Sequence, residues 1–91
     1  MVRTHQRIPN RLWRYRTLAG YTQKEVAVLL GVADTAMISR WERGLTMPSG
    51  EHLLKLSKLY KTLVNELYYE LGKEYEQELA KAIRKQQSNG P

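Results

Sequence analysis

Residues 22–44 read TQKEVAVLLGVADTAMISRWERG, and this stretch contains two helix signals separated by a short turn. At the start of the first signal, the Thr22 hydroxyl can accept a hydrogen bond from the third helical amide, while the Glu25 carboxylate reaches back to the Thr22 amide. Gly31 follows the last residue with helical spacing and is suited to end a helix. The first half of the stretch therefore predicts a short helix that runs to about Leu30.

The second half of the stretch predicts another helix over residues 34–43. Asp34 is a good N-cap, because its side chain can accept a hydrogen bond from an amide of the first turn. Ile38 and Trp41 have the spacing of two residues on one helical face, which we assign to the core. Gly44 is suited to end the helix.

Glu42 raises a question of charge, because it lies four residues after Ile38 and next to Trp41 and should also point inward. An unpaired buried carboxylate would cost several kcal/mol. Arg16 is the only cation on the inward stripe of an earlier helix, the one expected between Pro9 and Gly20, so we infer an Arg16–Glu42 ion pair between that helix and the 34–43 helix. The alternative is that either side chain extends to water.

Helical spacing continues on both sides of the stretch. An inward stripe lies between Pro9, which a first helical turn tolerates, and Gly20, a fitting terminator. Its members are Leu12, Tyr15, Arg16 and Ala19. Pro48 and Ser49 start a fourth helix, and a fifth begins near Thr62 or Leu63. The apolar side of these two helices is formed by Leu53, Leu56, Leu59, Tyr60, Leu67 and Leu71. Almost no segment alternates with period two, so we expect an all-α fold.

Composition favours one intracellular domain with an anionic partner. The chain has 91 residues, with 15 Lys and Arg against 9 Asp and Glu, a net charge of +6. Residues 1–20 contain five arginines and no acid, so the positive field lies at the amino end. Cysteine is absent, and no apolar run approaches the length of a membrane span. We expect no membrane association and a cytoplasmic location.

The segments TQKEVAVLLGV, ISRWERG and MPS together resemble the Cro and phage-repressor type of helix-turn-helix domain, also called the xenobiotic-response-element (XRE) family. The likeness covers about residues 8–70. It includes the arginine of the first helix, Gln-x-x-x-Ala in the second, Gly-Val, Ile-Ser-Arg-Trp-Glu-x-Gly and Pro-Ser. The resemblance implies five short helices that bind operator DNA, usually as dimers, with the third helix in the major groove. We therefore expect a five-helix, repressor-like bundle with an additional C-terminal helix.

The expected organisation has four parts. A flexible basic arm occupies residues 1–7, the helix-turn-helix domain residues 8–71, a C-terminal helix residues 72–87, and a flexible tail residues 88–91. An apolar residue recurs every fourth position through the C-terminal helix, at Leu71, Tyr75, Leu79 and Ile83. This stripe can fold back on the domain or pair with its copy in a two-fold dimer. We favour the dimer, because operators are commonly palindromic.

The outward face of the 34–43 helix is small and basic. Ala36, Arg40 and Arg43 lie opposite the inward residues, and Thr35 and Ser39 flank them. Small side chains let a helix approach base edges, and an arginine can donate two hydrogen bonds to a guanine. We expect Thr35, Ala36, Ser39 and Arg40 to read bases, with Arg40 as the principal reader. The alternative for Arg40 is a phosphate contact or a solvated surface role.

Phosphate contacts are expected beside this face. Gln23 opens a helix, where free amides and the helix dipole favour an anion, and the family resemblance implies the same role. Lys24 is its neighbour, Arg43 ends the recognition helix, and Thr46 lies in the following loop. A solvated surface role is the alternative for each of these residues.

Three classes of function were compared. An enzyme is not expected, because the sequence offers no paired carboxylates, nucleophile with a base, phosphate-binding glycine loop or metal cluster. His5 and His52 each stand without a second ligand, so we expect neither a cofactor nor a metal. The prediction is a sequence-specific transcriptional repressor that binds double-stranded DNA as a homodimer and is associated with the nucleoid. The alternative is an antitoxin-like module that binds a partner protein as well as DNA.

Overall fold

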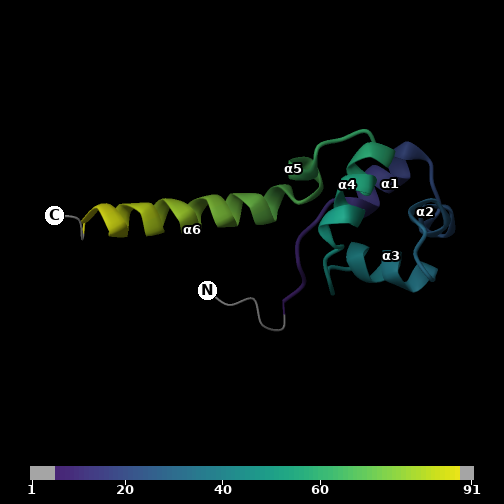
Figure 1. Ribbon diagram of the computed structural model, residues 1–91, viewed down its shortest axis with the longest axis horizontal. Coiled ribbons are helices and arrows are strands. Elements are labelled where there is room, and N and C mark those ends of the chain that lie inside the picture. The colour runs from purple at the N-terminus through teal and green to yellow at the C-terminus, as the bar shows by residue number, and fades with distance from the viewer. Residues whose placement is uncertain (1–5, 89–91) are drawn as a thin grey trace.

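The computed structural model describes residues 6–88, and its secondary structure over this range is entirely helical (Figure 1). The six helices are α1 (Leu12–Ala19), α2 (Gln23–Leu30), α3 (Thr35–Glu42), α4 (Gly50–Leu59), α5 (Val64–Leu67) and α6 (Tyr69–Ser88). The first five form a compact bundle, and α6 projects from it as a long single helix. The predicted all-α bundle with an additional C-terminal helix is confirmed.

Local sequence signals determine where the short helices begin. The capping box of α2 is present: the Glu25 amide donates to the Thr22 hydroxyl at 3.1 Å, and the Thr22 amide donates to Glu25 Oε1 at 2.8 Å. Asp34 caps α3 through a 2.7 Å bond from the Ala36 amide, and Ser49 caps α4. These caps satisfy amides that have no partner inside the helix.

One core joins all six helices. Its best-packed members include Val26, Ile38, Leu56 and Leu67, which expose 1% or less of their surface. The buried hydrophobic residues are Leu12, Val26, Ala27, Leu30, Ile38, Trp41, Leu56, Tyr60, Leu67, Tyr68 and Leu71. The inward faces predicted for Ile38 and Trp41 are therefore confirmed.

The end of the chain differs from the prediction. The fifth helix was expected to carry both Leu67 and Leu71, but α5 is a single turn that ends at Leu67. Tyr68 interrupts the helix with φ −125° and ψ 46°, and Leu71 belongs to α6. The expected boundary between residues 71 and 72 thus falls inside α6. Helical spacing on both sides concealed this break, because periodicity does not register a change of helix axis.

The first turn of α6, which begins at Tyr69 and is called its root below, is held against the start of α1. The Arg11 amide donates to the Leu67 carbonyl at 2.8 Å, and the Arg11 guanidinium pairs with Glu70 at 2.6 Å. The same guanidinium lies 4.6 Å from the centre of the Tyr69 ring, a cation–π geometry. Beyond this root the apolar stripe does not fold back onto the bundle: Tyr75, Leu79 and Ile83 are all exposed.

Candidate nucleic-acid interface

Glu42 is the centre of a polar cluster that joins α1, α2 and α3. Arg16 donates to both of its carboxylate oxygens, with Nη2 lying 3.1 Å from Oε1. The side chains of Arg16 and Glu42 expose 13% and 5% of their surfaces, so the pair is largely removed from water. Gln23 Nε2 donates to the same Oε1 at 3.0 Å. The structure thus brings together Arg16 and Glu42, the two residues inferred to pair, and adds Gln23.

The remaining donors of Arg16 extend this cluster to the loop after α1. Arg16 Nη1 donates to the Tyr21 carbonyl at 2.9 Å. The hydrogen bond to Glu42 raises the pKa of Arg16 above its ordinary value, so the guanidinium stays charged. Burial, and secondarily the charge of Glu42, raise the pKa of the nearby Tyr60 hydroxyl, which stays neutral. A single carboxylate near the end of α3 therefore fixes the orientation of α3 against the two preceding helices.

The N-terminal segment holds the carboxyl end of α3. Asn10 Nδ2 lies 3.2 Å from the Trp41 carbonyl and 3.3 Å from the Glu42 carbonyl, and its Oδ1 accepts from the Leu12 amide. Arg7 Nη1 donates to the Arg43 carbonyl at 3.0 Å. These carbonyls are among those that a helix end leaves without intrahelical partners. Arg7 was assigned to the flexible arm, whose residues 1–5 lie outside the described residues.

Gly44 permits this approach of the two segments. It has φ +74°, and a Cβ added there would lie 2.4 Å from the Ile8 carbonyl oxygen. The Ile8 amide donates to the Gly44 carbonyl at 2.8 Å, which requires close backbones. The sequence predicted Gly44 only as a helix terminator. The contacts of Asn10 and Arg7 with the end of α3 were not predicted, because they join residues far apart in the chain.

The residues expected to read bases lie along the part of α3 that faces away from the core. Ala36 and Arg40 are exposed, whereas Thr35 and Ser39 are half-buried at its flanks. Met37 is partly buried and packs against the core. The result is a narrow surface on which one long cationic side chain stands among small ones.

The residues expected to bind phosphate surround this surface in different ways. Lys24, Arg43 and Thr46 are exposed, on α2, at the end of α3 and in the following loop. Gln23 is half-buried, and one amide hydrogen is used by Glu42, which leaves the second for another acceptor. The carboxylate of Glu25 also lies at the start of α2, a negative charge that the phosphate prediction had not included.

Residues 6–88 contain neither a metal-binding cluster nor a helix that could span a membrane. No group of three or more His, Asp and Glu side chains in this range is placed to hold a metal ion. None of its helices is long and apolar enough to cross a membrane.

A family model described as helix-turn-helix matches residues 14–67, more than half of the 91-residue chain. The chain belongs to the XRE-type helix-turn-helix family. It is 42% identical over 64 residues to the HTH-type transcriptional regulator ImmR of Bacillus subtilis (strain 168). The match covers 70% of this chain and 47% of ImmR, so the chain spans about half the length of this curated relative. No solved structure gives a significant match.

Membership of the helix-turn-helix family confirms the resemblance found in the sequence. The matched residues extend from within α1 to the end of α5 and contain both helices of the motif, α2 and α3. The family match ends before α6 begins at Tyr69. The role of α6 therefore has to be argued from its own residues.

Proposed function

We propose that the chain is a sequence-specific DNA-binding transcriptional regulator that acts as a repressor. In this proposal α3 enters the major groove, and occupation of an operator blocks transcription. The observation that carries it is the exposed Arg40 among small side chains on a helix held by the buried Arg16–Glu42 pair. Family membership and the similarity to ImmR, named as a transcriptional regulator, support the same class of function.

Arg40 is the proposed base reader. Its guanidinium can donate two hydrogen bonds to O6 and N7 of a guanine, a pairing that discriminates by roughly 1–3 kcal/mol. Ala36 and Thr35 are small enough to contact a thymine methyl group, and Ser39 can bond to either kind of base edge. The rigid attachment of α3 matters here, because recognition requires the side chains to be held in one register.

The phosphate contacts surround this helix. In the proposal Lys24, Arg43 and Thr46 donate to backbone oxygens, together with the second amide hydrogen of Gln23. Such contacts fix the position of the protein and carry no sequence information directly. Because Gln23 also bonds to Glu42, a phosphate contact at Gln23 would couple the position of the backbone to the orientation of α3.

A two-fold homodimer completes the proposal. One α3 helix reads only a few base pairs, and two copies related by a two-fold axis would read a palindromic operator. The apolar face of α6 is the surface that we assign to this contact. As a regulator of this kind the protein would act on the nucleoid in the cytoplasm.

Selection of bound sites from a random double-stranded DNA pool tests the proposal. The expected result is one enriched motif with two inverted half-sites, bound by the purified protein alone. The selection should be repeated at two salt concentrations, because non-specific binding by a chain of charge +6 weakens steeply with salt. Retention of DNA without any enriched sequence would contradict sequence-specific regulation.

A further inference from the structure

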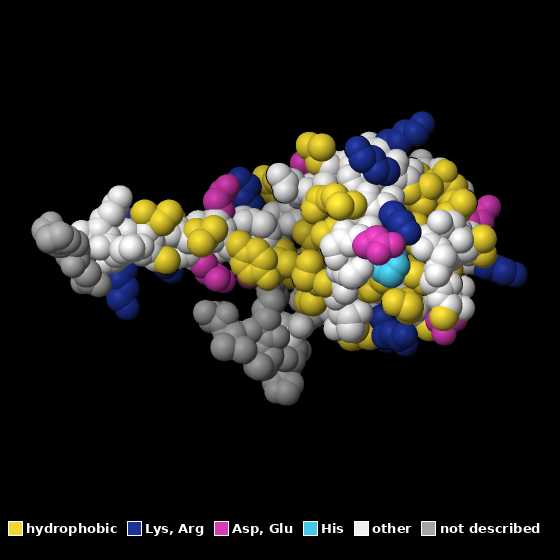
Figure 2. All heavy atoms as spheres, viewed as in Figure 1, with side chains coloured by type: hydrophobic (Ala, Val, Ile, Leu, Met, Phe, Trp, Pro, Cys, Tyr) yellow, Lys and Arg dark blue, Asp and Glu magenta, His cyan; other side chains and the backbone are white. Residues whose placement is uncertain are grey.

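The exposed apolar face of α6 is a feature that the proposed DNA interface does not use. Tyr75, Leu79 and Ile83 expose 51%, 62% and 55% of their surfaces, although they share one helical face with the buried Leu71. Figure 2 shows hydrophobic side chains along this helix that continue onto the bundle at its root. Helices in proteins gain most of their stability from packing such a face, so the face is suited to a contact.

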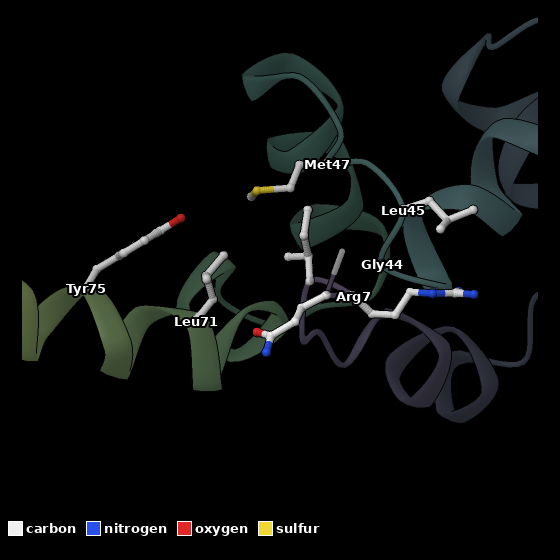
Figure 3. Close-up of a pocket in the computed structure, with 8 residues that line it drawn as sticks. Arg7, Gly44, Leu45, Met47, Leu71 and Tyr75 are labelled. Atoms are coloured by element: carbon white, nitrogen blue, oxygen red, sulfur yellow. The ribbon is translucent and has the colours of Figure 1, made fainter. Parts of the chain in front are cut away.

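The apolar surface extends past the helix into two open hollows. One hollow, of about 520 Å³, is lined by Leu71 and Tyr75 of α6 on one side and by Met47, Leu45 and Arg7 among others on the opposite side (Figure 3). The other, of about 540 Å³, shares Met47, Leu71 and Tyr75 and continues to Leu79. Met47, Leu71 and Tyr75 thus line both hollows, and the hollows can receive side chains of another helix.

The charges of α6 are separated along its length. Residues 69–78 hold four glutamates and one lysine, a formal charge of −3, and residues 79–88 hold three bases and no acid, a charge of +3. Two copies of α6 in parallel would place acids beside acids and bases beside bases. Two antiparallel copies would place each acidic half against a basic half, within the range of unscreened attraction.

The apolar residues and the charged residues of α6 are each arranged symmetrically along the helix, and the two centres of symmetry lie within half a residue of each other. Tyr75 and Ile83 lie four residues on either side of Leu79. Glu78 and Lys81, and further out Glu74 and Lys85, are arranged about a point half a residue beyond Leu79 and lie on one flank of the helix. A two-fold axis near Leu79 would therefore place each Tyr75 against the Ile83 of a second copy and each of these acids near a base.

We propose that α6 pairs antiparallel with α6 of a second copy of this chain, crossing it near Leu79. The inference rests on the homodimer of the proposed function and assigns its geometry. The every-fourth-residue stripe forms an i±4 ridge, and two such ridges interdigitate at a crossing angle of about −50°. The contact is thus a crossed pair centred on Leu79 rather than a long coiled coil, with Tyr75 entering the side of the partner helix.

The first test asks whether this face makes the contact. Leu79→Glu places a charge at the crossing point and should raise the dimer dissociation constant at least about tenfold by sedimentation equilibrium. Gln77→Glu is the matched control, because residue 77 lies on the opposite side of the helix and should leave the constant unchanged. A wild-type chain that stays monomeric at high concentration, or equal effects of both variants, would overturn the proposal.

The second test asks for the orientation. The doubly reversed variant E74K/E78K gives both halves of α6 a positive charge and should weaken an antiparallel dimer at least about tenfold at low salt. Adding K81E/K85E to it exchanges acid and base at the four paired positions 74, 78, 81 and 85 and should restore dimerisation to within threefold of wild type. A parallel dimer would not be weakened by the double reversal, because like charges already face each other there. Circular dichroism checks that α6 stays helical in each variant.

A separate readout distinguishes failure of this inference from failure of the proposed function. Monomeric Leu79→Glu protein should still prefer a DNA half-site over unrelated DNA, because α3 is unchanged. A Leu79→Glu protein that dimerises as wild type does and keeps its half-site preference would overturn only the α6 pairing, whereas a wild-type chain without any half-site preference would contradict the proposed function. A different protein that binds α6 and displaces the second copy would also overturn it and would favour the antitoxin-like alternative.

Discussion

Glu42 illustrates how one residue can determine the position of a functional helix. Its carboxylate accepts hydrogen bonds from Arg16 and Gln23, which belong to the two helices before α3. Removing two charges from water is costly, so a buried pair of this kind is weak evidence for added stability. Its physical role is better described as orientation: alternative packings of α3 would leave a charge without a partner.

Replacing Glu42 by alanine should destabilise the protein. The change leaves the buried Arg16 guanidinium without its carboxylate, although Arg16 keeps the Tyr21 carbonyl. We expect a loss of roughly 3 kcal/mol, measured by urea unfolding. Glu51→Ala is the control, because the exposed Glu51–Lys55 pair on α4 should contribute almost nothing. An unfolding midpoint unchanged from wild type for Glu42→Ala would contradict the role of the pair.

Gly44 lies where a side chain would not fit. Its positive φ disfavours a side chain, and an added Cβ would meet the Ile8 carbonyl at 2.4 Å. Gly44→Ala should therefore lower the free energy of unfolding by at least about 1–3 kcal/mol, the typical cost of a strained backbone position. Gly20→Ala is the matched control, since Gly20 also has a positive φ, +85°, but a Cβ there meets nothing within 4 Å. Equal stabilities of the two variants would show that the N-terminal segment does not hold α3 closely.

The direction of α6 depends on contacts at its root. Arg11 reaches the first turn of α6 through an ion pair with Glu70 and a contact with the Tyr69 ring. Both sides of the pair are accessible to water, so it directs the helix more than it stabilises the fold. The direction of α6 in turn decides where its apolar face is presented.

The Arg11–Glu70 pair predicts a measurable titration. The hydrogen bond from Arg11 lowers the pKa of the Glu70 carboxyl below its ordinary value of 4.5. The attraction is therefore complete above about pH 4.5 and is lost as the pH falls through the lowered pKa. NMR titration of the side-chain carboxyl should show the lowered value in wild type and a return toward 4.5 in Arg11→Ala. The same pKa of Glu70 in both proteins would contradict the Arg11–Glu70 pair.

Helix starts were predictable from the sequence because their signals are local. Thr22, Asp34 and Ser49 each act on amides within three residues, and the structure has all three caps. The break at Tyr68 was not predictable, since residues on both sides have helical spacing. At the candidate site, the Arg16–Glu42 pair was predictable, because each residue has the spacing of the inward face of its helix. The contacts of Gln23 and Asn10 with the end of α3 join residues far apart in the chain, and no local pattern indicates them.

The exposed residues of α3 and the apolar face of α6 lie on different parts of the molecule. The bundle presents α3 on one side, and α6 projects away from the bundle, which gives principal extents of 55 × 28 × 20 Å (Figure 1). A contact through α6 would therefore leave the exposed residues of α3 uncovered. This separation is what a dimeric DNA-binding protein requires, because the same two-fold axis must relate both the protein contact and the half-sites.

One set of titrations tests the claim that Arg40 reads a base. Wild type, Arg40→Ala and Lys24→Ala would be titrated against the selected site, its single-base variants and unrelated DNA at one salt concentration. Arg40→Ala should lose roughly 1–3 kcal/mol on the best site and relax preference at one base pair per half-site. Lys24→Ala should instead weaken binding to all sequences alike. An Arg40→Ala protein that binds every sequence more weakly by the same factor, with its base preferences intact, would contradict the claim.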